Sequence, residues 1–199
     1  MHISEGILSS QILIAGWVGT CAGVAYGLKK TKDYKIVRTA LLSSAFFLAS
    51  LVNIKIGAGS THLSFIAPMG LILGWGAFPA IFVALLLQAV LFQFGGFIVL
   101  GANTLAMASP ALFVNLIFGK IIRKSKNKFK VALFSFIAGF LAVILAASIA
   151  GAFLGLTDKN FLTAVKLLLA AHVPLALIEG FATMFLISWL KKAASEFLF

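Results

Sequence analysis

Apolar residues along this chain gather in long continuous runs. Most runs hold about 18 or more residues, and a short polar, basic or glycine-rich stretch separates each from the next. A β-barrel would instead alternate apolar and polar positions. The pattern therefore predicts an all-α, polytopic membrane bundle, with helices at about 7–28, 36–54, 63–73, 78–94, 102–122, 131–153 and 161–190.

Basic residues set the expected orientation of these helices. Lysines and arginines cluster at 29–38, 120–130 and 191–192, and such clusters mark the cytoplasmic side of a membrane protein. An even number of crossings must separate the first two clusters, which requires the short run 63–73 to cross. We therefore expect seven transmembrane helices with the N-terminus outside, in a single domain over 1–199.

Composition excludes several classes of protein. With 62% hydrophobic and only 11% charged residues, a soluble domain of this length would expose a large apolar surface. The net charge of +11 is carried mainly in short loops, so the bilayer is the expected environment and nucleic acid is not an expected partner. The single cysteine, Cys21, lies within an apolar run, and the N-terminus lacks the basic region of a cleavable signal.

The expected topology brings several polar or glycine-rich stretches to the outer face. These are Met1-His2, the segment 57–62, the loop 95–101 and Asn103. Irregular backbone at membrane depth is tolerated only where protein covers it or where it lines a cavity. The sequence therefore predicts a functional site at this face.

The chain start offers three nitrogens for a metal ion: the amine of Met1, the deprotonated amide of His2 and the His2 imidazole. A nearly flat nitrogen field suits Ni(II) or Cu(II), and Co(II) can also be held by nitrogens. His62 is the candidate for the fourth nitrogen. The alternatives are an ordinary solvated N-terminal histidine and, for His62, a polar residue bonded by Ser60 or Thr61.

His172 and Glu179 lie seven residues apart in the last helix, and so on one face of it. Ionisable groups within a membrane are often functional, so these two are candidates for a position behind the ligands, a place along the ion path or a conformational role. Structural hydrogen bonding within the bundle is the favoured interpretation of the two. An intramembrane enzyme using this pair has no supporting motif such as H-E-x-x-H.

Small residues recur every fourth position in the first helix, at Ala15, Gly19, Gly23 and Gly27. Such a face allows close approach of another helix, either within the bundle or from a docking partner. The chain has no G-x-x-x-x-G-K-[ST] phosphate loop. Uphill transport would therefore need energy from a partner.

The assembled motifs resemble the CbiM/NikM family, the substrate-binding components of energy-coupling-factor transporters for cobalt and nickel. The matching stretches lie at 1–6 (MHISEG), 59–63 (GSTHL), 73–80 (LGWGAFPA), 85–92 (LLLQAVLF), 95–96 with 100–103 (GG and LGAN), and 172–180 (HVPLALIEG).

The resemblance implies a transport component and no enzyme. It implies a six-helix core plus an extra N-terminal helix, in a bacterial or archaeal cell membrane. It also implies one Ni²⁺ or Co²⁺ held in a square-planar site by Met1, His2 and His62, with Ser60, Thr61, Asn103, His172 and Glu179 around it or along the path. The sequence after His62 favours nickel. An organic-vitamin component with the same fold is the alternative function.

The partners implied are a CbiQ/NikQ-type coupling protein and a CbiO/NikO-type ATPase pair. Because the chain ends soon after its last helix, a CbiN/NikN-type helper would be a separate protein or dispensable.

Overall fold

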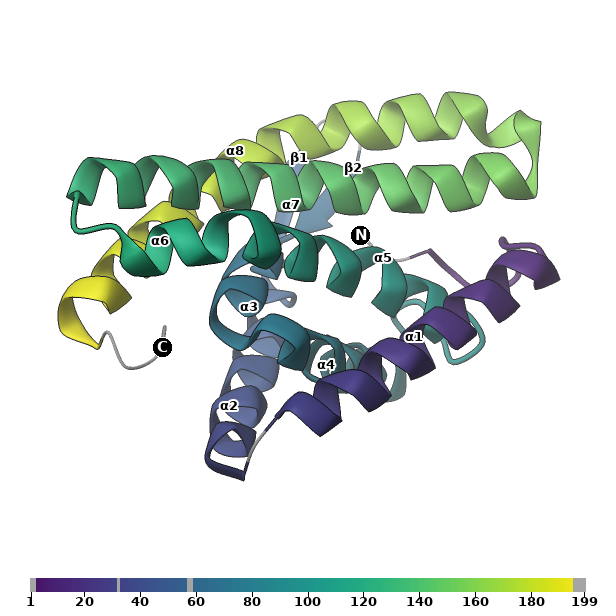
Figure 1. Ribbon diagram of the computed structural model, residues 1–199. Coiled ribbons are helices and arrows are strands. Elements are labelled where there is room, and N and C mark those ends of the chain that lie inside the picture. Colours follow the sequence, from purple (N-terminus) through teal and green to yellow (C-terminus); the bar gives the residue numbers. More distant parts are fainter. Residues whose placement is uncertain (1–2, 32, 57–58, 195–199) are drawn as a thin grey trace.

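The computed structural model describes residues 3–31, 33–56 and 59–194, and helices dominate it (Figure 1). The helices are α1 (Ser10–Lys30), α2 (Asp33–Ala49), α3 (Ile66–Leu73), α4 (Ala77–Phe92), α5 (Leu100–Val114), α6 (Lys120–Lys124), α7 (Lys128–Thr157) and α8 (Leu162–Ala193). A π-helical turn, Asn115–Gly119, joins α5 to α6, and 3₁₀ turns at Gly74–Gly76 and Lys159–Phe161 precede α4 and α8. The predicted all-α membrane class is confirmed.

A β-hairpin replaces the end of the predicted second helix. We expected helix to Ile54, but α2 ends at Ala49, and β1 (Asn53–Ile56) pairs antiparallel with β2 (Gly59–His62). That boundary was wrong. A strand satisfies its backbone through a partner strand, and the pairing of β1 with β2 places Asn53 opposite His62.

Five helical runs are long and apolar enough to cross a membrane, which fits a multi-pass membrane protein. They are Ser10–Lys30, Ile66–Phe92, Leu100–Lys124, Lys128–Thr157 and Lys159–Ala193. The α2 helix has 17 residues, and α3 and α4 form one continuous run through the turn Gly74–Gly76, so neither α2 nor α3 counts separately. The number of seven crossings, like the outside N-terminus, stays a prediction.

The chain reverses direction between α3 and α4. Close approaches of Gly70 to Ala111 and of Gly74 to Asn115 show that α3 runs parallel to α5. Along α1, Gly16 lies close to Ala102 of α5, and Gly27 lies close to Pro79 of α4. Together with the contact of Trp17 with Phe82, these approaches show that α1 runs parallel to α5 and antiparallel to α4. Gly74 has a positive φ of +56, which a glycine adopts without strain, and it ends α3 at this turn.

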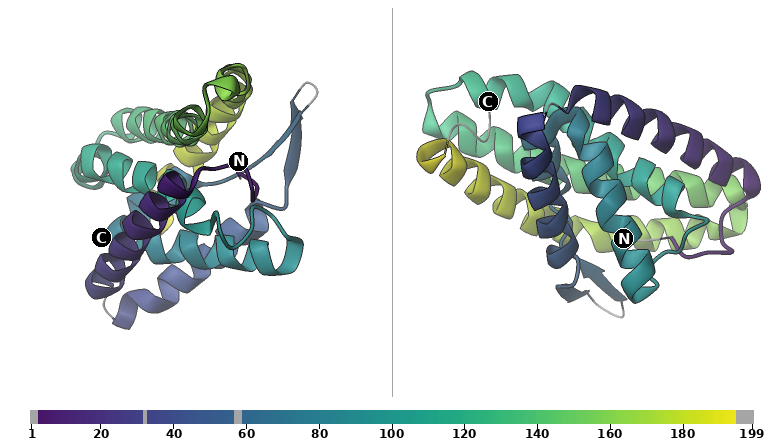
Figure 2. Two further views of the ribbon diagram at one scale, coloured as in Figure 1. Left: turned by 90° about the vertical axis from the view of Figure 1, so that its right-hand side faces the viewer. Right: turned by 90° about the horizontal axis from the view of Figure 1, so that it is seen from below.

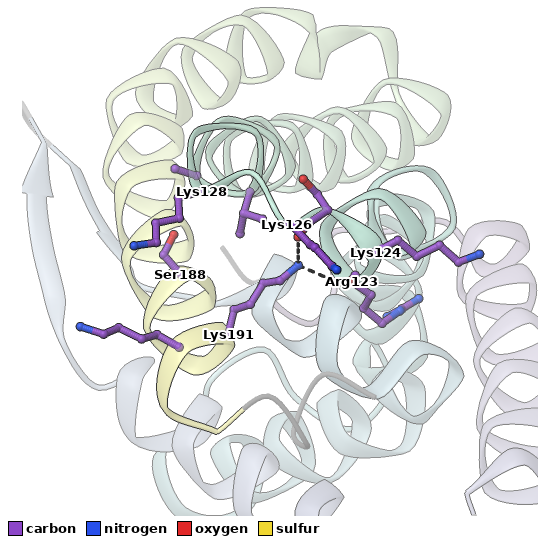
Figure 3. Close-up of a pocket in the computed structure, with 10 residues that line it drawn as sticks. Arg123, Lys124, Lys126, Lys128, Ser188 and Lys191 are labelled. Carbon is purple, nitrogen blue, oxygen red and sulfur yellow. Dashed lines mark hydrogen bonds between the residues drawn. The ribbon is translucent and has the colours of Figure 1, made fainter.

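The ends of α3, α6 and α8 lie together at the basic end of the bundle. Nζ of Lys191 in α8 donates to the carbonyls of Arg123 and Ser125 (Figure 3) and to that of Ile122. The end of α6 leaves these carbonyls without helical partners. Arg123 in turn donates to the Leu71 carbonyl at the end of α3. The structure thus joins two of the clusters that we expected on the cytoplasmic side, around a cavity of about 720 Å³.

Three of the four small residues proposed as a docking face are covered within the bundle. A Cβ on Gly19 would lie 2.9 Å from Leu105, Gly23 faces the ring of Phe78, and a Cβ on Gly27 would lie 2.7 Å from Pro79. Ala15 is exposed. These three glycines therefore pack within the bundle and leave no room for a helix of a docking partner.

The Gly23→Leu substitution tests this packing. The new side chain would meet the buried ring of Phe78, so we expect a loss of about 1–3 kcal/mol in the free energy of unfolding, measured in detergent. The matched control is Ala15→Leu on the exposed side of the same helix, which we expect to be nearly neutral. Equal losses for the two variants would contradict the packing described here.

Candidate metal centre

Asn103 holds the backbone that follows the predicted chelating residues. Met1 and His2 lie outside the described residues, so their role stays a prediction. Next to them, the amide of Ile3 donates to Oδ1 of Asn103, and Nδ2 of Asn103 donates to the Ile3 carbonyl, both at 3.0 Å. Asn103 is 4% exposed. This two-point contact fixes the chain one residue after His2 against the first turn of α5.

Glu5 forms a second anchor of the N-terminal segment. Its amide donates to the Gly95 carbonyl at 3.1 Å, and Oε1 of its carboxylate accepts from the Ile98 amide at 2.9 Å. The indole of Trp17 donates to the Ile98 carbonyl at 3.0 Å and so ties α1 to the same loop. The sequence analysis missed Glu5. Two features of the sequence pointed to Glu5: it is one of only five acidic residues, and it lies in the N-terminal motif MHISEG.

His62 lies at the end of β2 and is 6% exposed. Its Nδ1 lies 3.0 Å from the carbonyl oxygen of Leu63. A carbonyl can only accept, so Nδ1 carries the hydrogen, and Nε2 of the neutral ring carries the lone pair. A backbone carbonyl commonly fixes a metal-ligating histidine in this tautomer.

Burial also keeps His62 neutral. It lowers the pKa of this imidazole to about 4, and the neighbouring His172 acts in the same direction to a smaller extent. A metal ion requires the unprotonated ring, so His62 is ready to act as a ligand at neutral pH without first losing a proton.

Glu179 holds the segment that leads from His62 into α3. The carboxylate is 1% exposed and accepts from the amide of Ser64, from the Ser64 hydroxyl at 3.1 Å and from the Phe65 amide at 3.0 Å. These amides come just before α3, where a helix leaves its donors without partners and favours negative charge. Glu179 therefore positions the chain two residues after His62.

His172 lies on the same face of α8 and is 4% exposed. Its Nδ1 is 2.7 Å from the Leu168 carbonyl, and its Nε2 has no hydrogen-bond partner in the part of the chain that the structure describes. For Ser60 and Thr61 the structure describes the backbone pairing in β2 only, so their proposed contacts stay predictions.

The N-terminal segment and the chain leaving β2 approach each other beside α7 (Figure 2, left). Ile3 packs in a cluster with Val99, Ala102 and Ala150, while Leu63 packs against a cluster of Val143, Leu175 and Ala176. Among the described side chains no group of three or more His, Cys, Asp or Glu could hold a metal ion. The ligand set of Met1, His2 and His62 therefore stays a prediction, because Met1 and His2 lie outside the described residues.

Comparison with known proteins agrees with this architecture. The family model for CbiM, described as the cobalt uptake substrate-specific transmembrane region, matches residues 2–197. A Haemophilus influenzae relative, assigned to metal transport by its name, is 38% identical over 98% of this chain and 96% of its own length. A NikMN protein of Archaeoglobus fulgidus, named as a fused nickel transport protein, is 29% identical over 98% of this chain and 67% of its own length.

A solved structure has the same fold. The crystal structure of a transition metal transporter superimposes with a TM-score of 0.82 at 28% identity, covering 96% of this chain and 93% of that one. The helical membrane fold and these matches define a membrane component of metal transport. The chain belongs to the CbiM family, as the sequence motifs predicted.

Substitution of Glu179 tests its role before α3. In Glu179→Leu the amides of Ser64 and Phe65 lose their acceptor while buried, and we expect a loss of about 2–4 kcal/mol in the free energy of unfolding. Glu179→Gln keeps a carbonyl acceptor, so its loss should be clearly smaller. Thermal unfolding in detergent measures both. A Leu variant as stable as the Gln variant would show that these hydrogen bonds contribute little.

Proposed function

We propose that this protein is the substrate-binding component of an ATP-driven, energy-coupling-factor type importer that takes up Ni²⁺ or Co²⁺. The observation that carries the proposal is the paired hydrogen bond between Asn103 and Ile3. It fixes the backbone of the residue after His2 within the bundle, whereas an ordinary N-terminal histidine would need no such support.

The ion would be held by four nitrogens. Three come from the amine of Met1, the deprotonated amide of His2 and its imidazole, which close small chelate rings around one ion. The fourth is Nε2 of His62, whose other ring nitrogen donates to the Leu63 carbonyl. Such a flat field suits Ni(II), and Co(II) shares the ligands; the order of affinity favours nickel.

The ligands would be held in place by residues from distant elements. Asn103 and Glu5 fix the N-terminal segment, and Glu179 fixes the chain after His62. Outer residues of this kind commonly change metal affinity by about 10- to 100-fold when they are mutated. An organic vitamin would not require a free amino terminus, and no observation on the structure favours that alternative.

Energy for uptake would come from partners. The chain has no phosphate loop of the G-x-x-x-x-G-K-[ST] type, so a CbiO/NikO-type ATPase pair would hydrolyse ATP and a CbiQ/NikQ-type membrane protein would couple it to this chain. A CbiN/NikN-type helper is a further expected partner, and the fused NikMN relative supports that expectation. Reconstitution in vesicles with these partners should make Ni²⁺ or Co²⁺ uptake dependent on ATP.

Extension of the N-terminus by three glycines tests the four-nitrogen site. A single added residue would place the histidine third, where the amine, two amides and the imidazole could hold Ni(II) by themselves, whereas three glycines separate the amine from the chelate. The purified protein should then lose its tightly bound ion, as should His62→Ala. Elemental analysis after gel filtration measures the ion content. The matched control carries the same three glycines at the C-terminus and should keep one ion. Tight binding retained after N-terminal extension would overturn the chelate.

A further inference from the structure

The cavity at the basic end of the bundle is lined by one sign of charge. None of the acidic side chains that the structure describes lines it. Glu5 accepts from the Ile98 amide, Asp158 from the Asn160 amide after α7, and Glu179 from amides halfway along α8. The basic residues that line the cavity are Arg123, Lys124, Lys126, Lys128, Lys191 and Lys192. A cavity with this lining suits an anion.

Two of these basic side chains already have partners within the protein. Nζ of Lys191 donates to three backbone carbonyls at the end of α6, and Arg123 donates to the Leu71 carbonyl and to Oδ1 of Asn115. These contacts join α3, α6 and α8 and make the wall of the cavity rigid (Figure 3). The remaining four are exposed and form no ion pair with any carboxylate in the described part of the chain: Lys124, Lys126, Lys128 and Lys192. Their charge is therefore available to a ligand.

The cavity lies where three candidate membrane spans have their ends. One span ends at Lys124, the next begins at Lys128, and a third ends at Ala193. Lysines at the ends of spans extend towards the lipid headgroups. The basic side chains of the cavity are therefore placed at headgroup level.

The same cavity continues inward to the level of the acyl chains. Its lining includes Val131 and Ala132 on α7 and Ser188 on α8. At 1.5 Å per residue, these three lie about 5–8 Å inside the ends of their spans. The cavity therefore combines a basic mouth with a less polar wall, in the order in which a phospholipid presents its phosphate and its chains.

Large aromatic side chains are exposed next to this cavity. Trp189 is 59% exposed and follows the lining residue Ser188, and Phe129 is 73% exposed and follows Lys128. Tryptophan is enriched where headgroups meet acyl chains, because its ring is apolar and its N–H is polar. The exposure of both rings indicates that lipid covers this side of the bundle.

We propose that the cavity binds the headgroup of one anionic phospholipid. Its phosphate would pair with Lys126 and Lys128, and its acyl chains would pass Val131 and Ala132 into the bilayer. Basic pockets between transmembrane helices are suited to such headgroups. The volume of about 720 Å³ is in the usual range of ligand sites, about 300–1,000 Å³, and suits a headgroup with the first part of its chains.

The bound lipid would also stabilise the fold at this end. The four available lysines repel one another, and a phosphate among them would offset that repulsion. A ligand that binds only the folded state raises the temperature of unfolding. The inference does not depend on the ligands of the transported ion.

Native mass spectrometry of the full-length protein in detergent tests the site. The protein is titrated with phosphatidylglycerol and with phosphatidylcholine of the same acyl chains. We expect one phosphatidylglycerol to be retained and to raise the temperature of unfolding, with no such effect of phosphatidylcholine. In the double variant Lys126→Gln/Lys128→Gln the affinity for phosphatidylglycerol should fall on the order of 10- to 30-fold.

Two matched controls separate the cavity from charge alone. Lys29→Gln/Lys30→Gln removes the same charge from the exposed end of α1 and should bind the lipid as the native protein does. Ala132→Phe fills the inner wall without changing charge and should weaken binding, whereas Leu133→Phe adds a ring at an exposed neighbouring position and should not. The charge and wall variants are independent, so the proposal stays testable if one of them fails to fold.

Three results would overturn the proposal. The first is equal retention of phosphatidylcholine, or equal weakening by the α1 variant. The second is displacement of the lipid by inorganic phosphate, which would indicate a site for a free anion. The third is unchanged lipid binding in Lys126→Gln/Lys128→Gln together with loss of ATP-driven uptake, which would indicate a surface that docks a protein partner.

Discussion

The hydrogen bonds between Glu179 and the amides before α3 are the contact on which the arrangement of the site depends. They join residues 114 and 115 positions apart, and they meet halfway along α8. A buried carboxylate loses several kcal/mol of hydration, and only good hydrogen bonds can offset that loss. Here the amides that precede a helix supply them, so the carboxyl oxygens of Glu179 and the unpaired donors before α3 satisfy each other.

This contact also explains why α3 is so short. The helix has 8 residues because it begins beside the middle of α8 and ends at Gly74, among the groups at the basic end. The segment before it has no helical hydrogen bonds of its own, and within a membrane such backbone is acceptable only where protein satisfies it. The β1–β2 pairing satisfies the backbone of the strands, and the carboxylate of Glu179 satisfies the amides just before α3. His62 lies between these two sets of hydrogen bonds.

The N-terminal segment is secured by a different set of contacts. The glycines of α1 let this helix lie close to α4 and α5, and Thr20 donates to the Gly101 carbonyl at 2.6 Å. Asn103, on the same turn of α5, binds Ile3. Close packing of α1 and the position of the chain start are therefore coupled, because both depend on the first turn of α5.

The hydrophobic pattern and the short motifs of the chain were enough to predict most of the helices, the membrane class and the family. Long apolar runs carry enough local information to place six of the seven predicted segments within a few residues, since each helix satisfies its own backbone. The predicted end of the second helix was wrong, because Asn53 pairs with His62 and the residues there form a strand. The sequence left open whether the glycines of α1 faced a partner or the bundle. The contacts of Glu5, Asn103 and Glu179 became known only from the tertiary structure. Those contacts join residues about 90 or more positions apart, so no local pattern in the chain could name the partners.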